Sequence, residues 1–248
     1  MMFRICCKTP SESQTHLAQR MLAHGVPVQR TTWQSTSAPS PAFELANVVA
    51  EFPVPDSLTM WQEQCQADLP WSEDHFQERI SGKPLNPTPS YPDWPWHDKA
   101  HAEKFIREGK RFDHTYPERF WPKDAAGDYY QGYFGDLNDV AALLRRDPWT
   151  RQAYLPVYFP EDTGTTHGQR VPCTLGYHFI RNGPALDCNY FIRSCDLTRH
   201  YKNDVYLAGR LLQWMVDETS RQAFPYPGTL TIFISNLHLF TQDSWRFQ

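Results

Sequence analysis

The stretch from Thr174 to Ser194 constrains the fold more than any other part of the chain. Apolar and polar residues alternate there on both sides of Asn182-Gly183, first as TLGYHFI and then as ALDCNYFIRS. This alternation is typical of strands that bury one face, and Asn-Gly is a favoured hairpin turn. The sequence therefore predicts a β-hairpin, with Cys173 at its entrance.

Other elements are expected before this hairpin. Residues 42–54 are apolar enough for a first strand, and residues 153–159 should form another. A helix capped by Asn138 should end before Pro148, because proline cannot continue a helix.

A helix and a strand are expected after the hairpin. The segment after Asp204 carries apolar residues at helical spacing, which predicts a helix packed on the sheet. A last strand, 229–235, should follow a break at Pro227-Gly228. The residues at helical spacing are Val205, Ala208, Leu212, Met215 and Val216.

The order of these elements implies one α+β domain with a mixed sheet flanked by helices. Residues 1–40 are polar, and we expect them to form a loosely packed N-terminal segment ahead of the domain at 41–248. Residues 70–121 hold clusters of Trp, Pro and charged residues without a long period. They predict short helices that carry functional loops.

Composition excludes several classes of protein. A chain of 248 residues, 40% hydrophobic, can bury one large core, and its net charge of −4 gives no basic field for nucleic acid. No apolar run reaches the roughly 20 residues that span a bilayer. The start, MMFRICCKTP, lacks a secretory pattern, so we expect a cytoplasmic protein without a membrane or nucleic-acid partner.

Cysteine spacing indicates chemistry other than metal binding. The six cysteines form no CxxC pair and no Cys/His spacing of a tetrahedral site. We therefore expect reduced thiols and no metal.

Four segments of the C-terminal half carry a family resemblance. They are DPWTRQ (147–152), VPCTLGYHF (171–179), YFIRSCD (190–196) followed by Asn203-Asp204, and PGTLTIFISNLHLF (227–240). In this order they resemble the thymidylate synthase superfamily, whose pattern runs D-P-x-S-R-R, P-C-H, R-S-x-D with Asn eight positions on, and P-G with D-x-H-x-Y. The resemblance covers roughly 137–240. It implies a thymidylate-synthase-like fold and a homodimer with shared active sites. It also implies transfer of a one-carbon unit from 5,10-methylenetetrahydrofolate, a co-substrate, to a pyrimidine nucleoside monophosphate.

Two departures from the pattern point away from thymidylate synthase itself. Thr174 stands where the family has His, and Asp204 where the synthase has the Asn that contacts the base. An amide can accept from N3–H and donate to O4 of uracil, whereas a carboxylate only accepts. A carboxylate therefore suits cytosine, whose N4 amino group and protonated N3 are both donors. The pattern of Cys-Thr, then R-S-x-D, then Asn-Asp resembles the phage deoxycytidylate hydroxymethylases and related CMP hydroxymethylases.

The resemblance makes Cys173 the nucleophile that adds to C6 of the pyrimidine. A free thiol has a pKa of about 8.5, so nearby arginines would have to favour the thiolate. Cys188 and Cys195 are interpreted as small buried hydrophobic residues.

Phosphate binding is assigned by the same resemblance. Arg193 and Ser194 match the family's Arg-Ser, and Arg151 matches an arginine sent across the dimer interface to the neighbour's phosphate. Planar guanidinium groups suit phosphate oxygens. Gln152 stands where the family has a second arginine, and Arg30 is a weaker candidate for that contact.

Sugar and folate contacts follow. His238 matches the histidine that holds the sugar 3′-hydroxyl, but its partner tyrosine is Phe240, which forms no such hydrogen bond. Asp196 matches the aspartate that contacts folate; otherwise it would serve as a cap.

Upstream, the family needs a glutamate, a tryptophan and a tyrosine in that order. Glu78, with Glu73 as the alternative, would organise water and proton transfer, and Tyr116 would assist it. Trp96, with Trp94 as the alternative, would contact the folate. A glutamate in PWSEDHFQER is otherwise a solvated helix face.

Taken together, these residues predict a (d)CMP 5-hydroxymethylase in the cytoplasm of a bacterial cell or a phage-infected host. A (d)CMP or dUMP C5-methyltransferase is the alternative, since the two differ in whether water or a hydride completes the product. A non-catalytic nucleotide-binding relative is a further alternative, because the chain ends soon after His238. Retention of Cys173 argues against it. The sequence leaves open whether the sugar of the substrate is ribose or deoxyribose. It also leaves open whether the product serves phage DNA modification or nucleoside-antibiotic synthesis.

Overall fold

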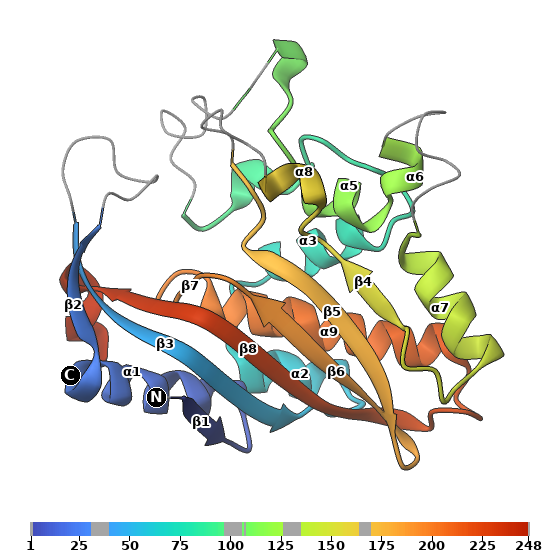
Figure 1. Cartoon of the computed structure of the whole chain (residues 1–248), viewed down its shortest axis with the longest axis horizontal. Coiled ribbons are helices and arrows are strands. Elements are labelled where there is room, and N and C mark those ends of the chain that lie inside the picture. The colour runs from blue at the N-terminus through green and yellow to red at the C-terminus, as the bar shows by residue number, and fades with distance from the viewer. Residues whose placement is uncertain are drawn as a thin grey trace.

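A single mixed sheet organises the molecule (Figure 1). The computed structural model describes residues 2–30, 40–96, 106, 108–125, 135–163 and 170–247. Among them, eight strands run in the order β1-β3-β8-β6-β5-β4, with β2 paired to β3 and β7 to β8. The strands are β1 (Phe3–Cys6), β2 (Val26–Arg30), β3 (Ser40–Pro53), β4 (Tyr154–Pro156), β5 (Thr174–Asn182), β6 (Ala185–Ile192), β7 (Cys195–Asp196) and β8 (Tyr226–Phe240).

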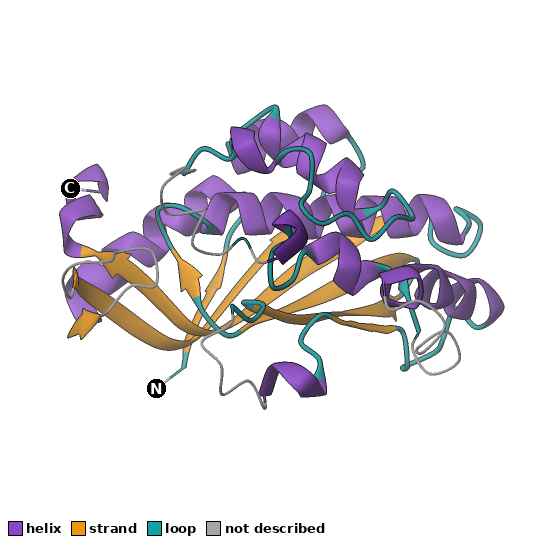
Figure 2. Cartoon of the chain, turned by 90° about the horizontal axis from the view of Figure 1, so that it is seen from above, coloured by secondary structure: helices purple, strands orange, loops and turns teal. Residues whose placement is uncertain are grey.

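Helices cover one face of this sheet (Figure 2). Helix α9 (Tyr201–Thr219) packs on β6 and β8, and α1 (Pro10–His24) packs on β3. No helix in the described ranges is long and apolar enough to cross a membrane. The other helices are α2 (Leu58–Cys65), α3 (Trp71–Arg79), α5 (Tyr116–Phe120), α6 (Pro122–Ala125), α7 (Leu137–Arg146) and α8 (Pro160–Thr163), with 3₁₀ turns η1 (Tyr91–Asp93), η3 (Glu108–Lys110) and η5 (Thr241–Phe247). The predicted α+β class with a mixed sheet is confirmed, as are short helices in 70–121.

The predicted hairpin is formed by β5 and β6, which are antiparallel. The turn lies one residue later than expected, because Asn182 still pairs with Ala185 and Gly183-Pro184 make the bend. Gly183 has φ +57°, a conformation that glycine adopts without strain. Tyr177 and Phe179 point into the core as the alternation predicts.

Helix α9 is confirmed, although it begins at Tyr201, before the expected start. Every residue of its predicted apolar face is buried. Helix α2 approaches it closely at Gly209, where a β-carbon would lie 2.1 Å from the Trp61 ring. Glycine is therefore required for this helix contact.

The expected break at Pro227-Gly228 is wrong, since β8 runs through both residues. Pro227 pairs with Leu186 just before a register shift between β6 and β8, where the missing N–H is tolerated. Gly228 leaves room for Asp187, which accepts a hydrogen bond from the Thr229 N–H at 2.8 Å.

Helix α7 ends before Pro148 as predicted, but its cap is Asp136 rather than Asn138. Asp136 accepts from the Asp139 N–H, and the Asp139 side chain accepts from the Asp136 N–H, which together form a capping box. Strand β4 is shorter than the predicted 153–159.

The expectation of a loosely packed N-terminus is wrong. Strand β1 pairs in parallel with β3, so the strand expected to be first is the third. Leu17 and Met21 of α1 are fully buried, and Ser13 Oγ lies 2.7 Å from Tyr201 Oη. Four residues apart on one helix face, these two apolar side chains help to anchor a mostly polar helix to the sheet.

Candidate active site

Cys173 lies immediately before β5, on a segment held by Arg193. The Arg193 N–H donates to the Cys173 carbonyl at 2.8 Å. Its guanidinium donates to the carbonyls of Pro172, at 2.8 Å, and Val171, at 3.1 Å. Arg193, the predicted phosphate contact, therefore also fixes the backbone that presents the thiol.

The Cys173 thiol sits in a partly compensated electrostatic environment. Burial raises its pKa above the ordinary value, Asp204 adds to the rise, and the positive charges of Arg193 and Arg170 oppose it. Because the rise prevails, the thiol is protonated at neutral pH in the ligand-free protein. Sequence reasoning missed Arg170, whose position three residues before Cys173 is the only signal that could have found it.

A hydroxyl chain adjoins the cysteine. Tyr116 Oη lies 3.1 Å from Thr174 Oγ1, which lies 2.9 Å from Tyr190 Oη. Tyr177 stacks on Tyr190 with ring centroids 4.7 Å apart. Burial raises the pKa of Tyr116, so its hydroxyl keeps its proton. Thr174, which replaces the family's His, thus links the Tyr116 hydroxyl on α5 to the Tyr190 hydroxyl on β6.

Asp204 projects from the first turn of α9 into the same region. Burial raises its pKa to about 7, and Arg79 is the main opposing influence. The Cys195 thiol donates to its Oδ2 at 3.7 Å, and no described cation forms a hydrogen bond with it. At neutral pH this carboxyl is therefore present in both protonation states.

Arg79, the last residue of α3, was missed by the sequence analysis. It is only 5% exposed, and its Cζ lies 4.0 Å from the centroid of the Tyr116 ring. Its spacing could have revealed it, since Ser72, Phe76 and Arg79 form one buried helix face. An arginine at a position typical of core residues is a candidate for a buried functional charge.

Both candidate glutamates are engaged elsewhere. Glu78 accepts from the Ser90 N–H at 2.5 Å and the Ser90 hydroxyl at 2.6 Å, with His75 Nδ1 at 3.0 Å. Although burial opposes it, these hydrogen bonds lower the Glu78 pKa. Glu73 binds Arg210 and Tyr206. Among the described contacts neither glutamate touches Cys173, so a role for Glu78 in proton transfer stays a prediction.

The predicted folate residues lie on either side of Arg199. Asp196 accepts from the Thr198 and Arg199 N–H groups and from the Arg199 guanidinium, which lies 2.9 Å away. The Arg199 Cζ is 5.3 Å from the Trp96 ring centroid. Trp96 Nε1 is buried without a hydrogen-bond partner among the described residues. Its alternative, Trp94, stacks on His200.

The remaining predicted residues are more scattered. Ser194 follows Arg193 directly, and His238 on β8 lies beside β7, with its ring at 5.3 Å from that of Phe240. Arg151 is exposed beyond α7, and its carbonyl accepts from His178 at 3.1 Å. Arg30 ends β2, but its side chain lies outside the described residues.

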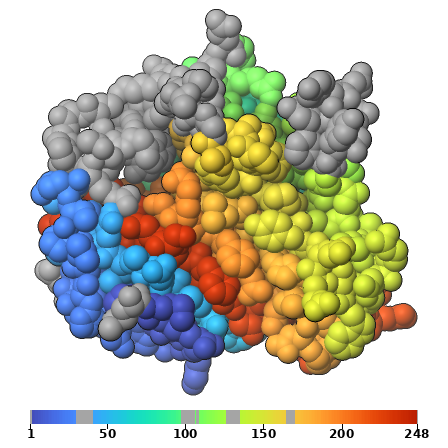
Figure 3. All heavy atoms as spheres, viewed as in Figure 1, coloured from blue at the N-terminus to red at the C-terminus, as the bar shows by residue number. Residues whose placement is uncertain are grey.

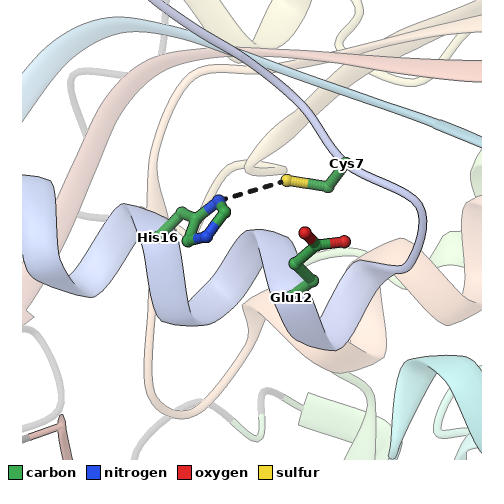
Figure 4. A group of neighbouring side chains, drawn as sticks. All are labelled: Cys7, Glu12 and His16. Carbon is green, nitrogen blue, oxygen red and sulfur yellow. Dashed lines mark hydrogen bonds between the residues drawn. The ribbon is translucent and has the colours of Figure 1, made fainter.

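A separate cluster at the start of α1 brings together Cys7, Glu12 and His16 (Figure 4). Cys7 Sγ lies 3.6 Å from His16 Nδ1, and Glu12 accepts from the Lys8 N–H at 3.0 Å. Burial raises the pKa of the Cys7 thiol. The Cys7 thiol is thus paired with the His16 ring, and the Glu12 carboxylate is paired with a backbone N–H. Each of these polar groups has a partner within the protein. All six cysteines are free.

The mixed sheet flanked by helices, with Cys173 before β5 and Asp204 in the first turn of α9, is consistent with a thymidylate-synthase-like fold. Sequence comparison agrees. The chain is 35% identical over 98 residues to the deoxyuridylate hydroxymethyltransferase of Bacillus phage SP01. The match covers 38% of this chain and 25% of the phage protein. No family model matches the chain. The similarity supports the thymidylate synthase superfamily.

Proposed function

We propose that this protein is a cytidylate 5-hydroxymethylase that uses 5,10-methylenetetrahydrofolate. The observation that carries the proposal is the meeting of Cys173, Tyr116 and Asp204 at one end of the sheet, where each influences the ionisation of another. Buried groups with shifted pKa values that converge on one nucleophile are typical of active sites. The similarity to a phage hydroxymethyltransferase supports a pyrimidine C5 transferase in general.

In the proposed reaction the Cys173 thiol gives up its proton to solvent as its sulfur forms a bond to C6 of the pyrimidine, which makes C5 nucleophilic. The folate supplies the one-carbon unit that C5 attacks. The C5 proton leaves to a water molecule that hydrogen-bonds to the Tyr116 hydroxyl. The bond between the one-carbon unit and the folate nitrogen then breaks, so that tetrahydrofolate departs with the electron pair and an exocyclic methylene is left on C5. Water then bonds to the exocyclic carbon and releases a proton, and the electron pair of the sulfur–C6 bond returns to Cys173. The products are the 5-hydroxymethyl nucleotide and tetrahydrofolate.

Asp204 serves both recognition and catalysis in this proposal. Its carboxyl and N3 of cytosine share one proton, while the other carboxyl oxygen accepts from the N4 amino group. That proton offsets negative charge that develops on the ring when sulfur adds to C6. The raised Asp204 pKa makes the proton available near neutral pH.

The described residues fit a folate co-substrate at Trp96. Its ring is flat and flanked by Arg199, and its buried Nε1–H has no hydrogen-bond partner within the described ranges. Such a donor is costly to bury unless a ligand atom accepts from it. Asp196 fixes Arg199 beside this ring and contributes through that arginine.

A second candidate, a deoxyuridylate enzyme, is favoured by two specific observations. The phage relative is named a deoxyuridylate hydroxymethyltransferase. A protonated Asp204 can also donate to O4 of uracil while it accepts from N3–H, as an amide does. A hydride in place of water would give a methyltransferase on either base.

We also propose a homodimer that packs through the sheet face opposite α9. Figure 3 shows strands β3, β8, β6 and β5 exposed across this face. Phe191 and Phe233 stack there at 4.9 Å and are only half buried. The Arg151 carbonyl binds His178, whose neighbours Tyr177 and Phe179 point to the opposite, buried face. Arg151 thus lies beside the proposed interface.

The test is the product formed with dCMP, CMP, dUMP and UMP, each incubated with methylenetetrahydrofolate and analysed by mass spectrometry. We expect cytidylate to gain one CH₂O unit. A gain of one CH₂ unit would indicate the methyltransferase, and a product only from uridylate would favour the second candidate. Nucleotide binding without any product would indicate a non-catalytic relative and contradict the proposal.

A further inference from the structure

The buried guanidinium of Arg79 carries an inference that rests on the proposed function and deepens it. Arg79 is held at the end of α3, where its carbonyl accepts from Trp121 Nε1 at 2.8 Å. The central carbon of the guanidinium lies over the Tyr116 ring. Tyr116 in turn contacts Thr174, the neighbour of Cys173. The charge is therefore positioned beside the proposed reaction centre.

The donors of this guanidinium are not used by the described part of the protein. Arg79 Nε is buried and has no hydrogen-bond partner there, and no ion pair joins Arg79 to a described carboxylate. The guanidinium nitrogens donate in the plane of the group, and the Tyr116 ring offers them no conventional acceptor. An unpaired buried donor is costly, and a ligand that accepts from it recovers that cost.

Arg210 of α9 provides a close contrast. It lies over the Phe76 ring, with Cζ 4.6 Å from the centroid, much as Arg79 lies over Tyr116. Its donors, however, are taken by Glu73, at 2.9 and 3.0 Å, and by Gln213, at 2.9 Å. The donors of Arg210 thus have partners within the protein, whereas Arg79 Nε has none among the described residues.

We propose that Arg79 is a ligand-contacting residue, whose guanidinium donates hydrogen bonds to a ring carbonyl oxygen of a bound substrate. Pyrimidine and pteridine rings both present such an oxygen. A phosphate is a poorer fit, because the carboxyl of Asp204 lies in the same region and would repel a dianion. Asp204 then supplies an acceptor and Arg79 a donor to the same flat, neutral heterocycle.

The test measures ligand affinity and stability in Arg79→Met, which keeps a long side chain but removes the charge and donors. Calorimetry with dCMP and dUMP alone gives the nucleotide affinity. The KM for methylenetetrahydrofolate reports the binding of the folate, which is the folate arm of the test. We expect one of them to weaken by about 10- to 100-fold, as for loss of a charged hydrogen bond. Loss of nucleotide affinity assigns the carbonyl to the base, and loss in the folate arm assigns it to the pteridine. The Tm should be unchanged or higher, since an unpaired buried charge is removed.

Two variants keep the outcome interpretable. Arg210→Met should lower the Tm and leave both affinities unchanged, because its contacts are internal. Arg79→Lys keeps the charge without the planar fork and should weaken binding by about tenfold at the parental Tm. If a folded Arg79 variant bound both ligands within about twofold of the parent, or lost stability as Arg210→Met does without loss of affinity, the proposal would be wrong. If the parent protein bound neither nucleotide nor folate, the proposed function itself would fail.

Discussion

The two ends of helix α3 belong to polar clusters of opposite character. At the N-terminal end, Ser72 Oγ donates to Asn203 Oδ1 at 2.9 Å, and Glu73 accepts from Tyr206 and Arg210. At the C-terminal end, Arg79 faces the region of Cys173, Tyr116 and Asp204 without a hydrogen bond to any described side chain. We call these the closed cluster and the open cluster.

The difference teaches which polar residues serve the fold and which serve a ligand. In the closed cluster each charge is matched by hydrogen bonds, so Glu73 keeps a lowered pKa despite burial. In the open cluster burial prevails, and the pKa values of Cys173 and Asp204 rise. Buried polar groups that lack partners are rare in native proteins, and a ligand is one explanation for those that converge on a site.

The largest effect is expected at Cys173. Cys173→Ala removes the only thiol placed to bond C6, so turnover should fall by at least about three orders of magnitude. Nucleotide affinity should change little, because the covalent bond adds little to ground-state binding. Single-turnover product formation and calorimetry measure the two quantities. Cys188→Ala, at a fully buried cysteine on β6, is the control and should retain activity.

Asp204→Asn should move the base preference of the open cluster. The amide matches the O4 and N3–H of uracil, and a mismatched buried pair costs roughly 1–3 kcal/mol. The ratio of kcat/KM for dCMP to that for dUMP should therefore fall by about one to two orders of magnitude. An unchanged cytosine preference in a folded variant would show that Asp204 only begins α9 and that another group contacts the base.

Binding of dCMP should depend on pH through Asp204. The folded pKa is raised to about 7 by burial, so the carboxyl is protonated below pH 7 and ionised above it. The pair that it forms with cytosine holds one proton, which binding must take up above pH 7. The Kd should then rise up to about tenfold per pH unit above 7. Calorimetry in buffers of different ionisation enthalpy counts this proton, and Asp204→Asn should abolish the uptake.

A smaller effect tests whether the open cluster is completed by a second subunit. We expect inactive Cys173→Ala and inactive Arg151→Ala subunits, when mixed, to restore up to about a quarter of the parental activity. A random mixture is half heterodimer, and each heterodimer has one intact site. Native mass spectrometry confirms the mixing. No recovery in mixed dimers would exclude a role for Arg151 in the neighbouring site.

The smallest effect on turnover is expected in the closed cluster. Glu73→Gln leaves Arg210 partly buried without its charge partner and should lower the free energy of unfolding by about 1–3 kcal/mol. Substrate affinity should stay at the parental value. Denaturant unfolding and calorimetry make the comparison. A loss of nucleotide affinity at parental stability would move Glu73 into the site and erase the distinction between the two clusters.

The sequence predicted the elements whose pattern is local. The β5–β6 hairpin and helix α9 follow from periods of two and 3.6 residues, which survive into the structure because each element buries one face. The last strand was predicted to begin at residue 229, after Pro227-Gly228, whereas β8 begins at Tyr226. A proline and a glycine break most strands, but here Gly228 accommodates Asp187 of the neighbouring strand, a contact between elements that are distant in sequence.

The candidate site was predictable only in part. Cys173 and Asp204 stand in motifs whose order is informative, and the structure brings them near Tyr116. Arg79 was missed because an arginine in FQERISG is ordinarily solvated, and only the packing of α3 on α5 and α9 buries it. Glu78 shows the converse. Its carboxylate was expected to be available, yet it forms hydrogen bonds with Ser90 and His75.

Release of tritium from C5-labelled dCMP tests the central claim most directly, because it reports the loss of the C5 proton and nothing downstream. With methylenetetrahydrofolate present, we predict that the parent protein releases tritium to water in step with product, and that Cys173→Ala releases none above background. Release by the alanine variant within about tenfold of the parent rate, or no release by the parent from labelled dCMP, would contradict covalent activation of cytidylate by Cys173.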